Sequence, residues 1–569
     1  MKARTGGRVL VALGIALLLG QGVVSGSGHG TVRTFPNGVA SGDVTTTSAV
    51  LWARSSVRGP VSFEVACDPW FRHVRARRFV HSGDPLVPVK AVVGGLVPGS
   101  RHYFRATAAN GRSAQGTFVT ATPPGRQSGL RFGVSGDWRG ELAPYPAVAN
   151  AKGRGLDFFV LLGDTIYADY PSPALPLPQA ETLEDYRLKH AEVYGERFGL
   201  NTLAGLRAGT SVLATIDDHE VTNDFAGGAP IASDDRFSGD PAALINDSEF
   251  FDNGLSAFQE YNPVRDLFYR TPDDPLTDDE RRLFRYRQWG DDAAVLVLDT
   301  RSFRDPGLAP ANPFDPADVG RFLVQSFDPR RTLLGRAQLG QLKQGLLQAH
   351  RRGVTWKLVM VPEPIQNLGP VGASDRFEGY AAERTEILRF IRAEGIRNVV
   401  FVAADIHGTL VNNLTYQEFP FGPQIPTDTF EVTTGSVAFD APFGPTVVEL
   451  AQGLGLLSPA EVAFYGSLPR EGKDAFVAGL VNSQVAPFGY DSLGLAGSPV
   501  VAELRKGGWA AVHVFGWTEF RIDPRTQKLS VDTWGIDPYT EADLSSDPAG
   551  VINRRPRVIS SFTVDPKAP

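Results

Sequence analysis

Sulfur is scarce in this sequence, which has one cysteine, Cys67, and two methionines among 569 residues. A single cysteine excludes an intramolecular disulfide, so stability must come from buried apolar side chains or from bound metal. A strong net charge is also lacking. The formal charge of −7, from 56 basic and 63 acidic residues, does not indicate a nucleic-acid surface or a polybasic membrane patch. We therefore expect no specific nucleic-acid binding.

The apolar run near the N-terminus is too short for a typical membrane span. It covers residues 9–19, whereas a helix that crosses a bilayer needs roughly 20 apolar residues. Basic residues precede the run and Val24-Ser25-Gly26 follows it, a pattern typical of a cleaved signal peptide. No Arg-Arg pair precedes it, which argues against a twin-arginine signal. We predict a signal peptide over residues 1–26, no stable membrane span, and export to the periplasm, the cell surface or the medium; an uncleaved anchor is the alternative.

The composition is that of a globular protein with several domains. Hydrophobic residues make up 42% of the chain and charged residues 21%, which allows substantial buried cores. A chain of 569 residues exceeds the size of a single core, so we expect more than one domain.

The first domain is predicted over residues 31–124. Short strand-like runs, such as 49–53 and 61–65, are separated by glycine and proline turns. This spacing is typical of an all-β sandwich. The segment 96–103 resembles the tyrosine corner of fibronectin type III domains, and Trp52 is the expected core tryptophan. We predict a sandwich of the fibronectin III or immunoglobulin-like class.

The second domain is predicted over residues 125–569. Pro123 and Pro124 cannot continue a central strand, because proline lacks the N–H that the sheet requires. After them, buried apolar runs alternate with helical stretches, which is typical of an α/β layered domain with β-sheets flanked by helices. Gly353 and Gly395 each follow a predicted helix, where glycine tolerates left-handed backbone. Strands are predicted over 130–134, 158–162, 212–216, 295–298, 357–361 and 399–403, and helices over 336–352 and 380–394.

Two stretches of the second domain lack a clear period. Residues 171–178 and 440–499 are rich in proline, glycine and apolar side chains. We predict that both are insertions over one face of the domain and that the longer one is a candidate lid.

Acidic and histidine residues follow directly after several of the predicted strands. In open α/β sheets the carboxyl ends of the strands meet at one rim, so residues far apart in sequence converge there. Carboxylate, phenol and imidazole groups crowded at a rim need a counter-charge, which a bound cation supplies. The motifs are Ser135-Gly136-Asp137, Gly163-Asp164-Thr165-Ile166-Tyr167, Asp217-Asp218-His219-Glu220 and Asp405-Ile406-His407.

Together these motifs resemble those of the alkaline phosphatase D (PhoD-like) metallophosphatases, a family within the calcineurin-like metallophosphoesterase superfamily. The resemblance covers nearly all of the chain, including the sandwich. It implies a metal-dependent phosphoric ester hydrolase that acts on a phosphate-ester small molecule or a phospholipid headgroup. The residues that carry it are Gly163-Asp164 with Tyr167, the runs 217–224 and 299–304, Asp405 with His407, and the segments 431–436 and 515–538.

The resemblance implies a role for each motif residue. Asp164 is the expected bridge between two metal ions. His219 matches the histidine that contacts the ester and assists the leaving group. The other implied ligands are Tyr167 and His407 for the first metal, Asp218 and Asp405 for the second, and Asp137 as the aspartate that begins the superfamily's set. Glu363 and Asn367 lie where the superfamily keeps a further ligand.

Ferric iron (Fe3+) and calcium are the expected cofactors. A phenolate such as that of Tyr167 favours ferric iron, and oxygen ligands at the second site favour a hard ion such as calcium. The chain departs from the family at one point. Members commonly carry a cysteine iron ligand near the first motif, whereas this chain has Ser135-Gly136-Asp137 there and its one cysteine in the sandwich. The identity of the first metal is therefore open.

The expected reaction follows from paired cations. Two cations roughly 3.5–4 Å apart can bind a phosphoryl oxygen and lower the pKa of a water that attacks phosphorus in line. Arg139 and Arg301 are candidate phosphate ligands, because a guanidinium fork matches phosphate oxygens; structural pairing is the alternative. A phosphodiesterase with phospholipase D-like activity, an inactive exported binding protein and a calcium-stabilised structural protein are the alternatives to a phosphomonoesterase. The sequence does not indicate the oligomeric state.

Overall fold

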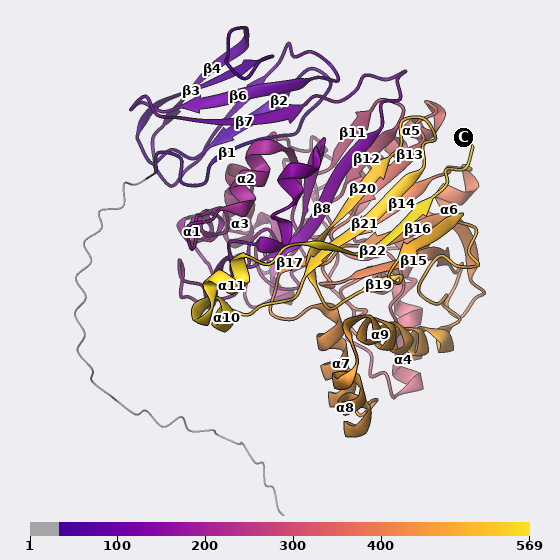
Figure 1. The fold of residues 1–569 in the computed structure, drawn as a ribbon. Helices are drawn as coiled ribbons and strands as arrows, with labels where there is room; N and C mark the ends of the chain where they lie inside the picture. The colour runs from indigo at the N-terminus through magenta and orange to yellow at the C-terminus, as the bar shows by residue number, and fades with distance from the viewer. Residues whose placement is uncertain (1–32, 569) are drawn as a thin grey trace, which may run out of the picture. The chain divides into compact units, whose positions relative to one another are not determined.

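The computed structural model describes residues 33–568, and the predicted signal peptide lies outside them. The first part of this range is an antiparallel β-sandwich, which confirms the predicted fold class (Figure 1). One layer is a four-stranded sheet with the order β4-β3-β6-β7. In the other layer the strands β1, β2 and β5 pair with one another in that order. The strands are β1 (Val39–Gly42), β2 (Ala49–Ala53), β3 (Gly59–Ala66), β4 (Val74–Ser82), β5 (Val89–Val93), β6 (Arg101–Thr107) and β7 (Ser113–Val119).

The sandwich shares a sheet with the α/β region. Strand β1 pairs in parallel with β10 (Ser211–Thr215), where Gly42 lies opposite Val212. A Cβ atom at Gly42 would lie 2.6 Å from the carbonyl oxygens of Val212 and Pro263, so no larger residue fits without a shift. The sheet therefore continues from the sandwich into the α/β region. The domain limits of 31–124 and 125–569 remain predictions from the sequence.

Trp52 is buried as expected, but on the other face of its sheet. Its indole Nε1 donates to the backbone oxygen of Glu260 at 2.8 Å, and the Arg207 guanidinium lies 4.5 Å from its ring. Both partners belong to the α/β region. The prediction of a core tryptophan in the sandwich is therefore wrong, because the second face of β2 is covered by α/β residues and not by solvent. The sandwich core uses phenylalanines instead, including Phe63, Phe104 and Phe118.

At the predicted tyrosine corner, the side chain that bonds back to the backbone is that of a histidine and not of Tyr103. His102 is fully buried, and its Nε2 lies 3.1 Å from the backbone oxygen of Val97. Tyr103 is only half-buried. Successive side chains of a strand point to opposite faces, so the register of β6 turns the residue before Tyr103 inward.

The α/β region contains two sheets packed face to face. Strands β8, β9 and β10 run parallel in the first sheet, and β12, β13 and β14 run parallel in the second. The first sheet has the order β18-β22-β21-β20-β8-β9-β10-β1-β2-β5, and the second has the order β11-β12-β13-β14-β16-β15-β19. Their strands are β8 (Leu130–Trp138), β9 (Phe158–Leu162), β11 (Arg285–Trp289), β12 (Ala293–Val297), β13 (Trp356–Met360), β14 (Val399–Ala403), β15 (Thr409–Tyr416), β16 (Ile425–Thr433), β17 (Ser436–Ala438), β18 (Ala502–Lys506), β19 (Ala510–Ala511), β20 (Phe515–Ile522), β21 (Leu529–Ile536) and β22 (Arg557–Val564).

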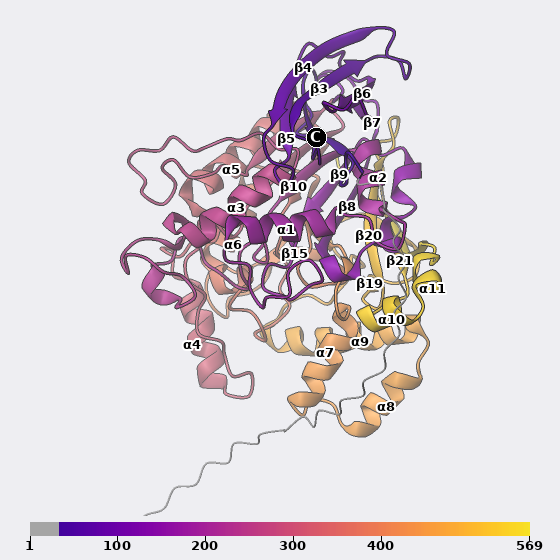
Figure 2. The ribbon, with the colours of Figure 1, turned by 90° about the vertical axis from the view of Figure 1, so that its left-hand side faces the viewer.

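Three apolar layers cover the faces of these sheets. One lies between them and includes Phe132 from β8 and Val295 from β12. The second packs the first sheet against α1 (Leu183–Val193), α2 (Thr202–Gly209) and α3 (Glu249–Tyr261), and the third packs the second sheet against α5 (Gly335–Arg351) and α6 (Ala381–Ala393) (Figure 2). The layering confirms the predicted α/β class with sheets flanked by helices.

The predicted strands and helices of this region are confirmed. Each of the six predicted runs overlaps a strand, and the two predicted helices are α5 and α6. Gly353 and Gly395 follow them with φ angles of 70° and 62°, the left-handed geometry expected of a residue that ends a helix.

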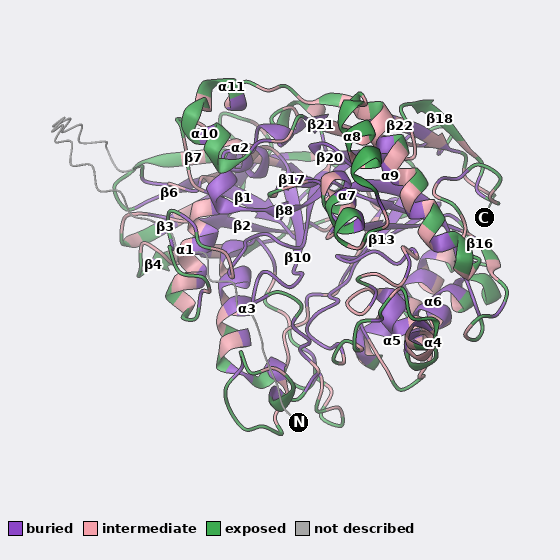
Figure 3. Cartoon of the chain, turned by 90° about the horizontal axis from the view of Figure 1, so that it is seen from below, coloured by how far each residue is buried: buried purple, intermediate pink, exposed green. Residues whose placement is uncertain are grey.

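The stretch 440–499 is more regular than its sequence indicated. It contains α7 (Phe443–Gly453), α8 (Pro459–Ser467) and α9 (Arg470–Val485). Its prolines start these helices: Pro442 and Pro469 precede the first turns, and Pro459 occupies the first turn of α8. Proline is well tolerated there because its missing N–H has no partner in the helix anyway. Figure 3 shows α8 almost wholly exposed.

The remaining helices are short or peripheral: α4 (Pro316–Ser326), α10 (Glu541–Ser546) and α11 (Pro548–Ile552). Residues 171–178 form neither helix nor strand. Among residues 33–568, no helix combines the length and the apolar character that a membrane crossing requires.

Candidate metal centre

The four sequence motifs meet where the parallel strands of both sheets end. Asp137 lies at the end of β8, Asp164 follows β9, and Asp218 follows β10. Asp405 and His407 follow β14 of the second sheet. The carboxyl ends of strands from two sheets therefore supply one site.

The backbone of this site is unusual. Asp137, Asp164, Asp405 and His407 have φ angles of 61°, 50°, 66° and 56°. Left-handed geometry is uncommon for residues other than glycine and costs on the order of 1–3 kcal/mol each. Its repetition at four positions shows that the surrounding fold holds these side chains in place against a local cost.

Two groups of possible ligands overlap at Asp164. In one group, ligand atoms of Asp137, Asp164 and His407 lie within 4.8 Å of one another. In the other, Asp164, Asp218 and His219 meet the same limit. Asp164 is the residue the groups share, which is the arrangement that a bridging carboxylate requires.

Several oxygens of this site have no internal partner. Both carboxylate oxygens of Asp137 and the Oδ1 atom of Asp164 are buried without a hydrogen bond. Burial, together with the neighbouring acids, raises the pKa of both carboxyl groups well above the usual range. An ionised carboxylate without a partner is costly inside a protein, so these residues fit a bound cation.

Tyr167 lies where the sequence motif predicted. Its hydroxyl donates to Asp164 Oδ2 at 2.9 Å, and its ring centroid lies 4.2 Å from that of His219. Burial and the adjacent Asp164 raise the pKa of the Tyr167 phenol well above its usual value. A phenolate at this position therefore needs a cation beside it. Phe439, which follows β17, packs against Tyr167 and against His407, whose ring centroid lies 3.8 Å from its own.

His219 is oriented by a second acid. Its Nδ1 lies 2.6 Å from Asp169 Oδ1, which leaves Nε2 as the ring nitrogen available to the site. Burial opposes protonation, but Asp218 and Asp169 outweigh it and raise the pKa of His219 to about 9. The two acids therefore favour the protonated form of the His219 imidazole. Its place in the second ligand group puts it next to Asp164 and Asp218 as well.

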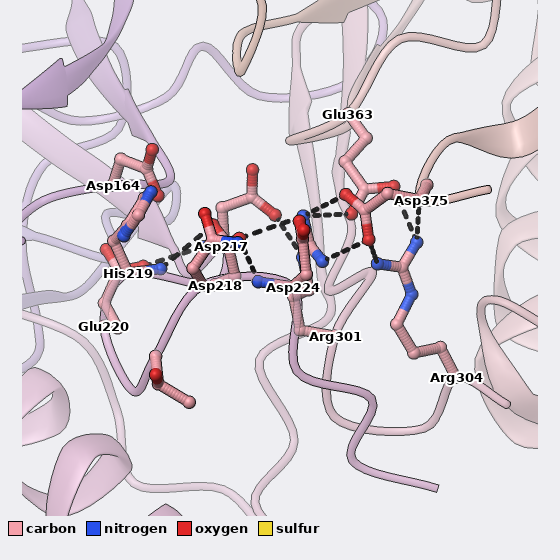
Figure 4. A network of polar contacts seen from close by, with 12 residues as sticks. Asp164, Asp217, Asp218, His219, Glu220, Asp224, Arg301, Arg304, Glu363 and Asp375 are labelled. Carbon is pink, nitrogen blue, oxygen red and sulfur yellow. Dashed lines mark hydrogen bonds and ion pairs between the residues drawn. The ribbon is translucent and has the colours of Figure 1, made fainter. Parts of the chain in front are cut away.

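A separate network surrounds Arg301 (Figure 4). This side chain is fully buried; its Nε donates to Asp217 at 2.6 Å, and its two NH groups bind both oxygens of Asp375 at 2.9 Å. Arg301 and Arg304 each bind Glu363 at 2.7 Å. The carboxylates of this network thus have guanidinium partners. Glu363 pairs with two arginines and belongs to neither group of metal-ligand atoms.

The Arg301 network also reaches the metal ligands. Arg301 lies 3.6 Å from Asp218 Oδ2. Burial opposes ionisation of Asp218, but Arg301 and His219 outweigh it and lower the pKa of this carboxyl. Arg301 was a candidate phosphate ligand, with structural pairing as the alternative. Its guanidinium pairs with four carboxylates, those of Asp217, Asp218, Glu363 and Asp375, which favours the structural alternative and a positioning role. Asn367 is half-buried.

Arg139 and Asp405 border the site. The guanidinium of Arg139 pairs with Glu141 and Asp440, and it lies 4.5 Å from the ring of Tyr170. Asp440 is well exposed, so this end of the site opens toward solvent. Burial and Asp217 raise the pKa of Asp405 well above the usual range, although Asp405 lies outside both close ligand groups.

Sequence reasoning did not identify three residues of this region. Asp169 follows Tyr167 by two positions, so the extended motif contained a signal for it. Asp375 and Phe439 lie in irregular segments after β13 and β17. No periodic pattern marks such positions, and only the folded chain brings them to the site.

Comparison with known proteins identifies relatives over most of the chain. Residues 133–453 match the family model described as PhoD-like phosphatase, and residues 23–122 match the model of the PhoD-like phosphatase N-terminal domain. Alkaline phosphatase D of Bacillus subtilis (strain 168) is 27% identical over 430 residues, which cover 71% of this chain and 70% of that protein. A solved structure named "Structure of PhoD" has a TM-score of 0.67 and 21% identity, and covers 93% of this chain and 90% of its own. This last likeness concerns the fold.

Proposed function

This chain belongs to the PhoD-like phosphatase family, and from the geometry of its site we propose that it is a metal-dependent phosphoric ester hydrolase. One observation carries the proposal: two groups of ligand atoms share Asp164, and its Oδ1 and both oxygens of Asp137 are buried without a hydrogen bond. Such an arrangement supports a pair of cations and not a single closed ion.

The donor atoms indicate which residues would hold each ion. Asp137, Tyr167 and His407 offer mixed oxygen and nitrogen donors to the first, with ferric iron favoured by the phenol. Asp218 and Asp405 offer oxygen to the second, which favours calcium. Asp164 would belong to both. When bound, the ions supply charge neutralisation and an activated water for in-line attack on phosphorus.

The chain's own groups would handle the proton and the orientation of the ester. His219 Nε2 donates a proton to the leaving oxygen, while Asp169 holds the ring through Nδ1 at 2.6 Å. Arg301 holds Asp217 and approaches Asp218 at 3.6 Å, so it positions the loop that carries His219. Arg139, next to the exposed Asp440, is the guanidinium that a phosphate entering from solvent would meet.

Metal analysis and turnover of matched esters test the proposal. We expect two or more metal ions per chain and hydrolysis of an aryl phosphate monoester that chelation abolishes. Faster turnover of the matched diester would favour the phosphodiesterase alternative. Bound metal without hydrolysis of either ester would indicate a binding or structural protein and overturn the proposal.

We also propose that the protein is exported, on the basis of the signal-peptide pattern in residues 1–26. The intact mass of protein recovered from outside the cytoplasm tests this. The expected mass corresponds to a chain that starts near Ser27. A mass that includes Met1 would contradict cleavage.

A further inference from the structure

Positive charge is concentrated in the sandwich. Residues 33–122 contain 11 arginines and lysines and four acidic residues, although the whole chain has a formal charge of −7. Four of these arginines lie within seven consecutive residues, from Arg72 to Arg78. The net charge of the chain therefore conceals a region that attracts anions.

The four arginines lie on the edge strand of the four-stranded sheet and in the turn before it. Arg75, Arg77 and Arg78 belong to β4, and Arg72 lies in the preceding turn. Figures 1 and 2 show β4 at the outer end of the sandwich. All four residues are exposed, and in the described part of the chain only Arg77 pairs with a carboxylate, that of Glu64. The other three guanidinium groups can bind an anion from solution.

Two large aromatic rings lie among these arginines. Trp70, in the turn, and Phe79, on β4, are each 70% exposed. The Arg72 guanidinium lies 5.1 Å from the centroid of the Trp70 ring. Phe79 and Arg77 are two residues apart on β4, so their side chains point to the same face of the sheet. The surface therefore presents flat apolar rings next to positive charges, and exposed apolar groups of this size are typical of a binding surface.

The turn that carries Trp70 is fixed by internal contacts. Asp68 accepts hydrogen bonds from the backbone N–H groups of Trp70 and Arg72 at 3.0 and 3.2 Å. Phe71 is buried, and the Arg105 guanidinium lies 4.5 Å from the centroid of its ring. The one acidic residue of the segment 67–82 is thus engaged within the turn. The exposed ring is held in place before a ligand binds, which lowers the entropic cost of binding.

We propose that this surface binds single-stranded nucleic acid without regard to its sequence. Guanidinium forks match phosphate oxygens, and exposed aromatic rings stack on unpaired bases, which is the combination that proteins use to hold single strands. A duplex keeps its bases stacked inside and offers phosphates alone, and an acidic polysaccharide offers negative charge without flat rings. The inference does not depend on the proposed function. The residues of the surface are Trp70, Arg72, Arg75, Arg77, Arg78 and Phe79.

A labelled phosphorothioate oligothymidylate tests the proposal, because its backbone keeps the negative charge and resists hydrolysis. A length of about 20 nucleotides exceeds the roughly 4–16 that one single-strand-binding fold covers. We expect fluorescence anisotropy to show binding to the metal-loaded protein that weakens with salt. The slope of log K against log salt should be roughly −3, because each of four arginine contacts contributes about −0.7. A duplex and an oligomer that lacks bases should bind more weakly.

The variants Trp70→Ala and Phe79→Ala remove the stacking rings. Loss of one stacked base corresponds to about fivefold to a hundredfold in affinity, so we expect each variant to weaken oligothymidylate binding within that range. The salt slope and the affinity for the base-free oligomer should not change. Phe421→Ala is the matched control, because Phe421 is 67% exposed and lies in the α/β region.

The variants Arg75→Gln and Arg78→Gln remove single charges from the same surface. We expect each to reduce the salt slope by roughly 0.7 and to weaken binding of the base-free oligomer as well. Arg525→Gln, at an exposed position in the turn between β20 and β21, should change neither quantity.

Three results would overturn the inference. The first is absence of binding at about 50 mM salt, where electrostatic contacts are strongest. The second is binding that all four surface variants leave intact. The third is tighter binding of heparin than of oligothymidylate, lost in the arginine variants and unchanged in Trp70→Ala and Phe79→Ala, which would assign the surface to acidic polysaccharides.

Discussion

Two clusters of buried carboxylates lie side by side at the ends of the strands, and they differ in the source of their counter-charge. Asp217, Glu363 and Asp375 meet the guanidinium groups of Arg301 and Arg304 (Figure 4). In contrast, Asp137 and Asp164 have carboxylate oxygens without any hydrogen bond. The first cluster is neutralised by the chain itself. Among residues 33–568, no arginine or lysine forms an ion pair with Asp137 or Asp164, so a cation from solution would supply their counter-charge.

The pKa values follow this difference in part. Burial opposes ionisation of Asp375, but Arg301 and Arg304 outweigh it and lower its pKa. Burial and the neighbouring acids raise the pKa values of Asp137 and Asp164 well above the usual range; His219 lowers the pKa of Asp137 but does not outweigh burial. Burial also keeps the pKa of Asp217 raised, to about 6, despite Arg301. Burial likewise raises the pKa of Glu363 well above its usual range despite Arg301 and Arg304. The difference between the clusters is therefore that the first has arginine partners, whereas the second has the unpaired carboxylate oxygens expected of a cation site.

The largest expected effect comes from Asp164→Asn. The substitution removes the charge shared by both ligand groups, so we expect both metals to be lost and aryl phosphate hydrolysis to fall by at least about 100-fold. Metals per chain and turnover are the measurements. Tyr167→Phe is the comparison: it should weaken the first metal, abolish any phenolate-to-iron absorption and leave the second ion. Full metal content and full activity in Asp164→Asn would show that this cluster is not a binuclear site.

In the metal-free protein we expect the same substitution to be stabilising and not damaging. Once chelator has removed the ions, Asp164→Asn should have a higher Tm than the wild type, because it removes the charge of a buried carboxylate whose Oδ1 has no hydrogen-bond partner. Thermal unfolding with and without chelator measures this. A lower Tm in the chelated variant would mean that Asp164 is stabilised by the chain, as Asp375 is.

His219→Ala tests the imidazole next to the cluster of Asp137 and Asp164. General acid catalysis contributes on the order of 10²–10⁴-fold, so turnover of an ester with a poor leaving group should fall within that range. The loss should shrink for a leaving group that needs no proton, and metal content should stay largely intact. Loss of metal in parallel with activity would assign His219 to the second ligand group instead, where it lies near Asp164 and Asp218.

Arg301→Met tests the cluster that the chain neutralises. Removing one partner from a buried ion pair typically costs about 3–5 kcal/mol, and here four carboxylates lose a cation. We expect a loss of this size in the free energy of unfolding, measured with urea, and the same loss with chelator present. Arg330→Met is the control: Arg330 forms an exposed pair with Asp328, and its removal should have no measurable effect. A loss that disappears on chelation would contradict the division between the two clusters.

The sequence indicated the candidate metal ligands more clearly than the carboxylates that pair with Arg301 and Arg304. Asp137, Asp164, Asp218 and Asp405 follow apolar runs of strand length, and the rule that strand ends converge places them together. Asp375 follows no such run. Its position depends on the path of an irregular loop, which local pattern does not determine. The same limit left phosphate binding and structural pairing of Arg301 as equal alternatives, because the sequence does not show which carboxylates surround it.

The fold shows the same division between local and tertiary signals. The hydrophobic period predicted the strands and helices α5 and α6, and glycines marked the ends of those helices. The face on which Trp52 packs was not predictable, because it depends on β1 joining β10. Helices α7, α8 and α9 were hidden by prolines that act as helix starts.

The smallest expected effect concerns Asp43, a carboxylate that extends the comparison to the junction of the sandwich with the α/β region. Asp43 accepts from the backbone N–H of Arg265 at 2.9 Å and lies 3.2 Å from Arg285 Nε; Arg287 also pairs with it. It is buried at 1% exposure, yet no metal ligand lies near it in sequence. Like Asp375, it is neutralised by the chain.

The pH dependence of stability separates this carboxylate from the metal ligands. Burial opposes ionisation of Asp43, but Arg285 and Arg287 outweigh it and lower its pKa to about 2, below the 3.8 of a free aspartate. The stabilisation is therefore fully present above about pH 4 and lost as the pH falls toward 2, and it amounts to about 2 kcal/mol. The difference in unfolding free energy between wild type and Asp43→Asn, measured with urea in chelator, should shrink across that range. Asp84→Asn, an exposed acid of the same sandwich, should show no such trend. A difference that stays constant with pH would mean that the arginines do not hold Asp43 ionised, and the rule that paired carboxylates stabilise this fold without metal would fail at its simplest case.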